Sequence, residues 1–368
     1  MDFPPITPLL PLGISFFVFE FIHYQVDINR GSVPVKNWLE FSIFGAFFPT
    51  QIAGPIKRYE DFVPQLNRQP SFSLPRIGEG LKYILWGLFK KVVLADNLAP
   101  LVAIGFGQAV GGAGGNASLS SGDAWLTVLA FTLQIYFDFS GYTDMGRGSA
   151  MLLGFNLPEN FKFPYLAANI SDFWRRWHIT LSGWLRDYIY IPLGGNRKGR
   201  YRNLLITTVL GGLWHGANWT FIIWGLYHGI GLTVFWLWRS LGLNFDRFRV
   251  WKLLNWGATF LFVFFGWIFF RSENLDQAGS MFKAVLAMNN GPANVFLDYE
   301  RIFILTVLIS WGIVEITLMN KTWLKDHLPQ GSTALIQFLR PTIYSLILVL
   351  ILLLNPANSG PQFIYFQF

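Results

Sequence analysis

The residue best placed to do chemistry is His215, within the stretch 211–219 that reads GGLWHGANW. The stretch belongs to a long apolar segment, so the imidazole is expected at membrane depth, where an ionisable side chain is costly and usually functional. The neighbouring glycines leave room for a backbone or a substrate to come close. A desolvated, neutral imidazole is a good general base, and we therefore predict a catalytic role for His215. The alternative is a structural histidine bonded to a neighbouring helix.

A second histidine, His178, follows two arginines in the sequence SDFWRRWHIT. Guanidinium groups recognise phosphates well, so Arg175 and Arg176, with Arg186 nearby, predict a phosphate-binding cluster on the cytoplasmic side. We expect Ser171 to cap the helix that carries them. The alternative is an interfacial amphipathic helix whose arginines anchor it to lipid headgroups.

The other histidines carry weaker signals. His23 and Glu20 are spaced so that they could pair on one helix face. The separation of His228 from His215 would not place both on one face of an unbroken helix, which favours a structural role for His228. His327 lies in a polar stretch and is expected to be incidental.

Several kinds of chemistry are excluded by composition. The chain has no cysteine, which rules out thiol catalysis, zinc–thiolate sites and disulfides. It also has no metal-ligand spacing, no Walker loop and no serine-triad pattern, and the glycine run 111–115 is typical of a flexible loop. We therefore expect neither a bound metal nor a bound cofactor.

The elements that must position these residues are membrane helices. The chain is 52% hydrophobic and 13% charged, against about 25% charged in soluble domains. It is predicted to be an all-α, polytopic integral membrane protein with about eight spanning helices, forming a single domain over 1–368. A shorter apolar run at 41–55 and the polar, aromatic stretch 162–195 are expected to be re-entrant or interfacial and to line a cavity or tunnel. The predicted spans are 8–27, 92–108, 124–140, 203–218, 219–238, 253–270, 302–320 and 334–355.

The distribution of basic residues orients these spans. Lys and Arg are in excess in the loops at 56–91, 141–202, 239–252 and 321–340, which are therefore predicted to be cytoplasmic. The net charge of +7 is explained in this way and does not indicate nucleic-acid binding. The same reasoning places 109–123, 271–301 and the tail 356–368 outside the cytoplasm.

Four central motifs resemble the membrane-bound O-acyltransferase family, in particular its bacterial alginate O-acetylation branch. Weaker matches at 11–16, 48–55, 265–271 and 363–368 extend the resemblance over nearly the whole chain. It begins almost at the first residue, so the helices that usually precede PLGISF in the family are expected to be missing. The four motifs are QIYFDFSGYTD at 134–144, FWRRWHITLS at 173–182, WLRDYIYIPLGG at 184–195 and LWHGA at 213–217.

The resemblance implies roles for individual residues. His215 matches the hallmark histidine of the family and His178 its second histidine. A tunnel across the membrane is implied, with acetyl-CoA as a donor substrate that enters from the cytoplasm. Tyr365 in the terminal FIYFQF matches a tyrosine proposed as an acyl carrier in related systems; the alternative is that these aromatics anchor the tail at the bilayer interface.

From these observations we predict a multi-pass O-acetyltransferase of the bacterial inner membrane. It would move acetyl groups from cytoplasmic acetyl-CoA across the lipid bilayer for O-acetylation of an exported, alginate-like polysaccharide, handing them to a periplasmic acetyltransferase partner. Peptidoglycan O-acetylation and teichoic acid D-alanylation are alternatives within the same class. A transporter gated by His215 and a non-catalytic scaffold are alternatives outside it.

Overall fold

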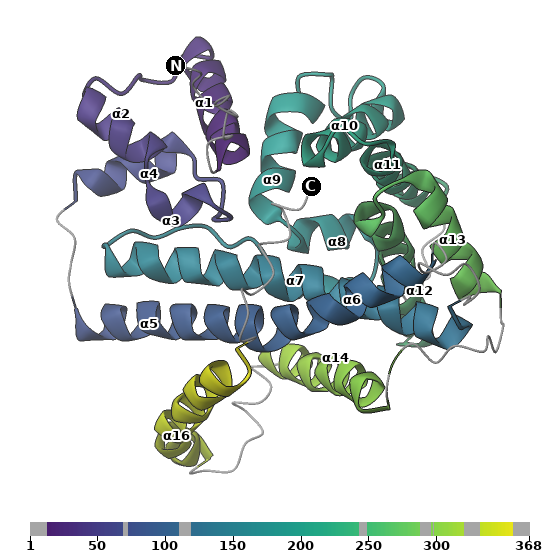
Figure 1. The fold of residues 1–368 in the computed structure, drawn as a ribbon. Coiled ribbons are helices and arrows are strands. Elements are labelled where there is room, and N and C mark those ends of the chain that lie inside the picture. The colour runs from purple at the N-terminus through teal and green to yellow at the C-terminus, as the bar shows by residue number, and fades with distance from the viewer. Residues whose placement is uncertain are drawn as a thin grey trace, which may run out of the picture. The chain divides into compact units, whose positions relative to one another are not determined.

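The computed structural model describes residues 13–68, 73–109, 119–242, 249–287, 296, 298–319 and 332–355. Regular secondary structure in these ranges is helical (Figure 1), which confirms the all-α prediction. The chain divides into two compact units: a first unit of Met1–Gly87 with Tyr142–Glu159, and a second unit of Leu88–Gly141 with Asn160–Phe368. The prediction of a single domain over 1–368 stays a prediction.

The helices follow one another as expected for a chain of apolar segments with short connections. The N-terminal part contains α1 (Ile14–Asn29), α2 (Trp38–Gly45), α3 (Phe48–Gln51), α4 (Tyr59–Leu66) and α5 (Leu74–Leu88). Next come a π-helical turn (Phe89–Ala95), α6 (Asp96–Ala109), α7 (Ser121–Leu152), α8 (Ile170–Arg176) and α9 (Ile179–Leu185). The remainder contains α10 (Arg200–His215), α11 (Trp219–Ser240), α12 (Arg249–Arg271), α13 (Leu275–Leu286), α14 (Asp298–Met319) and α16 (Ser332–Leu353).

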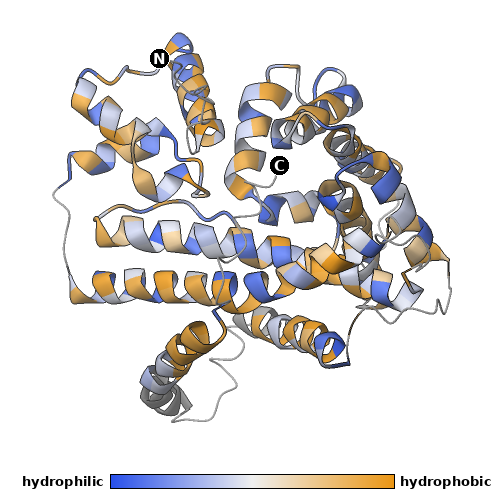
Figure 2. Cartoon of the chain, in the orientation of Figure 1, coloured by the Kyte–Doolittle hydropathy of each residue, from blue (hydrophilic) through white to orange (hydrophobic). Residues whose placement is uncertain are grey.

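Three helical segments among the described residues are long and apolar enough to cross a membrane: Leu74–Ala109, Trp219–Ser240 and Val250–Arg271. Hydrophobic residues predominate on α6 and on the coloured part of α16 (Figure 2). The helices α10, α11 and α12 match the predicted segments 203–218, 219–238 and 253–270 closely. The count of about eight crossings stays a prediction.

Interpreting 56–91 as a charged loop was wrong. Helix α5 begins at Leu74 and continues without interruption through the π-helical turn into α6. The charges of Arg76, Glu79 and Lys82 recur every third residue, so they fall along one side of a helix and are compatible with an apolar opposite side. The Lys82 Nζ atom lies 3.0 Å from the Glu79 carboxylate on that side.

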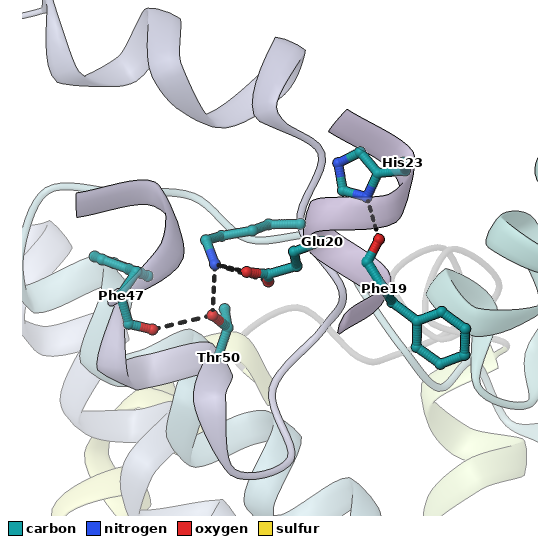
Figure 3. Close-up of polar contacts among 6 residues, drawn as sticks. Phe19, Glu20, His23, Phe47 and Thr50 are labelled. Carbon is teal, nitrogen blue, oxygen red and sulfur yellow. Dashed lines mark hydrogen bonds and ion pairs between the residues drawn. The ribbon is translucent and has the colours of Figure 1, made fainter. Parts of the chain in front are cut away.

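The first unit has an aromatic core with one buried ion pair in it. The Lys57 ammonium donates to both Glu20 carboxylate oxygens at 2.7 Å and to Thr50 Oγ1 at 3.0 Å (Figure 3). Lys57 is 2% exposed and Glu20 is 3% exposed. Glu20 therefore pairs with Lys57 and not with His23, whose Nδ1 lies 3.0 Å from the carbonyl oxygen of Phe19. The surrounding core is formed by Tyr24, Phe44, Phe47, Tyr59, Phe62, Ala150 and Leu157.

In the second unit, another buried lysine connects two helices. Its ammonium, on Lys91 of the π-helical turn, lies 2.7 Å from Asp96 Oδ1 and 2.7 Å from Asp138 Oδ1 of α7. Opposite charges attract strongly where water is scarce. We infer that the contact fixes the register of the turn against α7.

The hairpin of α10 and α11 is the scaffold of the site described below. A β-carbon on Gly212 would collide with the carbonyl oxygen of Phe221, and one on Gly225 would collide with that of Thr208. The two backbones therefore approach as closely as small residues allow, as in tightly packed membrane helices. Helices α8 and α9 and the π-helical turn Arg186–Tyr190 fill part of the stretch 162–195, where short helices were predicted.

Candidate active site

A cavity of about 570 Å³ lies in the second unit, between the α10–α11 hairpin and the short helices α8 and α9. Its lining includes His215, Arg175, Arg186, Trp174, Trp224 and His228. Ligand sites are usually concave and largely apolar with a few converging polar groups, and this cavity has that composition.

His215 is the last residue of α10, and its imidazole lies on the cavity wall. The helix ends there because Gly216 adopts an extended backbone, and Asn218 then caps α11 by accepting a hydrogen bond from the Thr220 amide at 3.1 Å. The His215 ring packs edge-on against Trp224, with centroids 5.2 Å apart. The partial negative charge of a helix C-terminus favours a positive charge beside it, which suits a base that takes up a proton.

His178 is 1% exposed and does not line the cavity, although the next residue, Ile179, does. Its Nδ1–H donates to Asn160 Oδ1 at 3.3 Å, and the same oxygen accepts from the Thr180 amide at 3.1 Å and hydroxyl at 2.9 Å. Burial, with a further effect of His215, holds the pKa of His178 well below its usual value. His178 is therefore a neutral imidazole whose ring orientation is set by Asn160. Sequence reasoning missed Asn160 because it lies in an irregular segment with no periodic signal.

The arginines are only partly placed as expected. Arg175 lines the cavity, whereas Arg176 lies outside the lining and pairs with Asp172, with Nε 2.9 Å from Oδ2. Arg186 also lines the cavity, and it too pairs with a carboxylate, with its Nε 2.6 Å from Asp187 Oδ1. Helix α8 is capped by Asn169, which accepts from the Asp172 amide at 2.8 Å, so the expected cap at Ser171 was wrong.

His228 joins the same cavity, contrary to the expectation from its spacing. That expectation assumed one unbroken helix, but the chain turns between His215 and Trp219 and reverses into α11. Trp224 is in ring contact with both imidazoles, with centroids 5.2 Å from His215 and 4.9 Å from His228.

A second cavity of about 400 Å³ opens at the Gly216 end of the hairpin. It is lined by polar groups of Asn218, Arg271, Ser272 and Glu273 together with the Phe221 ring. The Phe221 ring also faces His215, with centroids 6.1 Å apart. Phe221 therefore borders the second cavity on one side and the His215 imidazole on the other.

Comparison with known proteins assigns the chain to a family. Residues 28–275 match the model of the membrane-bound O-acyltransferase family. The chain belongs to this family. The matched region contains His178, His215 and His228, and it leaves Tyr365 outside. Tyr365 also lies outside the residues that the structure describes, and its role as a carrier stays a prediction.

Curated relatives within the family include several named enzymes. The chain is 47% identical over 286 residues to a probable alginate O-acetylase of Pseudomonas putida, covering 77% of this chain and 56% of the relative. It is 36% identical to a peptidoglycan O-acetyltransferase of Helicobacter pylori, covering 98% of this chain and 75% of the relative. It is 31% identical over 256 residues to a teichoic acid D-alanyltransferase of Streptococcus thermophilus, covering 64% of this chain and 60% of the relative. The chain spans about half the length of the first alginate O-acetylases it matches.

Proposed function

We propose that this family member is an O-acetyltransferase of the bacterial inner membrane that takes acetyl groups from acetyl-CoA and serves O-acetylation of an exported, alginate-like polysaccharide. The observation that carries the proposal is the position of His215. The imidazole ends helix α10 on the wall of a cavity whose lining also carries two arginines, Arg175 and Arg186.

The cavity supports a donor that is anionic at one end and reactive at the other. Arg175 and Arg186 would bind the phosphates of acetyl-CoA through charge-assisted hydrogen bonds. The uncharged arm of the donor would then follow the apolar wall toward His215. Binding at both ends would hold the thioester carbonyl in a fixed position for attack by a hydroxyl, which lowers the entropic cost of bringing the two groups together.

The proposed reaction is a direct acyl transfer. His215 removes the proton of the acceptor hydroxyl as its oxygen forms a bond to the thioester carbonyl carbon. The carbon–sulfur bond then breaks, and the departing thiolate takes the proton from the imidazolium. The products are an acetyl ester and free CoA, and the imidazole is neutral again. His178, held neutral and oriented by Asn160, would position the groups around His215.

The second cavity suits the acceptor. Its Arg271, Glu273 and Asn218 offer hydrogen-bond donors and acceptors to a hydroxyl-bearing molecule. The segment beginning at Arg271 was predicted to lie outside the cytoplasm, which suits an acceptor arriving from that side. The acceptor would be a sugar hydroxyl or a carrier hydroxyl, with Tyr365 as candidate carrier and a periplasmic acetyltransferase as the next partner.

A second acceptor class is favoured by one comparison. The peptidoglycan O-acetyltransferase of Helicobacter pylori aligns with 98% of this chain. Peptidoglycan is therefore the second candidate for the final acceptor, with the same donor and the same role for His215.

The proposal is tested with the purified full chain in liposomes, using acetyl-CoA labelled in the acetyl group. We expect label to move to mannuronate oligosaccharides, or to muropeptides if the second candidate holds. Heat-inactivated protein is the control. Failure to consume acetyl-CoA in the presence of both acceptors and a membrane extract would contradict the proposed function.

The cavity arginines give a further prediction. Replacing Arg175 and Arg186 together with alanine should raise the KM for acetyl-CoA about tenfold or more while kcat changes little, because phosphate binding is lost about equally in the ground and transition states. Steady-state kinetics at varied acetyl-CoA measures this. Arg176→Ala is the matched control, since Arg176 pairs with Asp172 outside the lining. An unchanged KM with a lower protein yield would show that the cavity arginines serve as lipid anchors.

A further inference from the structure

The His228 imidazole is a buried polar group that no protein group satisfies among the described residues. It is 1% exposed, and neither Nδ1 nor Nε2 has a hydrogen-bond partner in that part of the chain. Its neighbours are rings: Trp224 at 4.9 Å, Trp174 at 5.1 Å and Phe262 at 5.6 Å between centroids. A histidine kept only for structure would be expected to bond a nearby carbonyl or hydroxyl, as His23 does with Phe19.

Two indole rings beside His228 also have buried nitrogens without hydrogen-bond partners. The Nε1 atoms of Trp174 and Trp224 are buried and also have no partner among the described residues. The two rings lie 5.8 Å apart between centroids, and both line the 570 Å³ cavity together with His228. The three side chains come from α8 and α11, and we call them the His228 cluster.

Burying the ring nitrogens of this cluster costs free energy unless a hydrogen-bond partner is supplied. A buried donor or acceptor without a partner loses its hydration and gains nothing in return. Close aromatic packing holds the rings in place, so the cluster cannot easily turn toward other groups. Unsatisfied buried groups in a cavity wall therefore point to a ligand that supplies the missing partners.

The chemistry of the cluster defines the ligand group. An indole nitrogen only donates hydrogen bonds, and a neutral imidazole can donate one as well. The matching partner is an acceptor such as a carbonyl oxygen. A phosphate is a poorer match, because none of the three side chains carries a fixed positive charge and the cavity has Arg175 and Arg186 for that purpose.

We propose that the His228 cluster binds the carbonyl oxygens of the donor's pantetheine arm and of its thioester, and so positions the acetyl group beside His215. The inference rests on the proposed function, because it takes acetyl-CoA as the donor. Trp224 is in ring contact with both His215 and His228, so a carbonyl held by the cluster lies next to the catalytic imidazole. His228 and Trp174 are thereby assigned as donor-binding residues.

Two substitutions test this role, since each keeps an aromatic ring and removes the ring nitrogens; Trp174→Phe also makes the side chain smaller. His228→Phe and Trp174→Phe are compared with the wild type for binding of acetyl-CoA and of adenosine 3′,5′-bisphosphate, which carries two of the donor's three phosphates but lacks the arm. We expect each variant to bind acetyl-CoA about tenfold more weakly, the size of one lost hydrogen bond in a dry site. Binding of adenosine 3′,5′-bisphosphate should not change.

Controls separate this result from a folding defect. The variant His23→Phe removes a buried, hydrogen-bonded histidine in the first unit and should leave binding of both ligands unchanged. The Arg175→Ala, Arg186→Ala double variant should weaken both ligands. Without ligand, His228→Phe should be at least as thermostable as the wild type, because it removes buried polar atoms that lack partners. His228→Asn, which can still donate a hydrogen bond, is expected to recover part of the acetyl-CoA affinity.

The outcomes decide between the inferences. Equal acetyl-CoA binding by the wild type and both ring-preserving variants would overturn the role of the His228 cluster and leave the proposed function standing. A loss of thermostability in His228→Phe without a change in binding would identify a structural histidine and also overturn the inference. A wild type that binds adenosine 3′,5′-bisphosphate and acetyl-CoA equally well would exclude recognition of the arm. If the wild type bound neither, acetyl-CoA would be excluded as donor and both proposals would fail.

Discussion

His215→Ala is expected to lower acetyl transfer by about 10²–10⁴-fold, the usual contribution of a general base. The imidazole ends α10 on the cavity wall, where the proposed reaction needs a group that takes the proton from the acceptor hydroxyl. Water cannot replace it at the same position, because the ring is held by packing against Trp224 and Phe270. The measurement is the rate of ester formation at saturating acetyl-CoA.

The same variant should keep its donor affinity, since the phosphates and the arm are bound elsewhere in the cavity. His215→Gln is the companion variant, because it restores much of the side-chain volume without restoring a base. Both variants should lose transfer to about this extent while acetyl-CoA still binds. Transfer by either variant within a few-fold of the wild-type rate would remove His215 from the mechanism.

Lys57→Met is expected to destabilise the protein by about 3–5 kcal/mol, because it leaves the Glu20 carboxylate buried without its partner. Glu20 and Lys57 are almost completely buried, and the Lys57 ammonium lies 2.7 Å from both carboxylate oxygens (Figure 3). Methionine keeps a similar length and volume, so the lost charge is the main change. Thermal unfolding in detergent, followed by tryptophan fluorescence, measures the effect.

The double variant Glu20→Gln, Lys57→Met should recover much of the loss, because removing both charges of a buried pair is often close to neutral. Lys82→Met is the matched control. Lys82 pairs with Glu79 at 3.0 Å, but both side chains are more than 40% exposed, and exposed pairs contribute only about 0–1 kcal/mol. If Lys57→Met were no more destabilising than Lys82→Met, the buried pair would have no structural role in the first unit.

Much of this architecture could be predicted from local sequence. The apolar segments 203–218, 219–238 and 253–270 became helices with nearly those bounds, because hydrophobic length and composition act within one segment. His215 could be singled out for the same reason: an ionisable group among glycines and tryptophans in an apolar run is conspicuous without any knowledge of its neighbours. The short helices of 162–195 could be predicted in the same way, because polar residues interrupt the aromatic and apolar residues of that stretch.

Other predictions failed because a local rule does not tell where a helix continues, where it ends and which residues it meets. Charges in 56–91 suggested a loop, yet Arg76, Glu79 and Lys82 lie along one side of α5. His228 was separated from His215 by helix periodicity, which ceases to apply where Gly216 and Asn218 end one helix and start the next. Arg176 and Arg186 could not be ranked from the sequence, because each pairs with a nearby carboxylate and only the fold places Arg186 in the cavity lining.

The sequence by itself determined that this chain is a helical membrane protein of the O-acyltransferase family, and it singled out His215 as the candidate catalytic residue. Tertiary structure alone decided which residues surround that histidine. In the folded chain Glu20 pairs with Lys57, His178 bonds Asn160, and Trp174 packs against His228. The two residues of each pair are too far apart in the sequence for helical periodicity to predict their contact. Helix formation depends on neighbours a few residues apart, whereas the partners of a buried polar group depend on how helices pack and where they end.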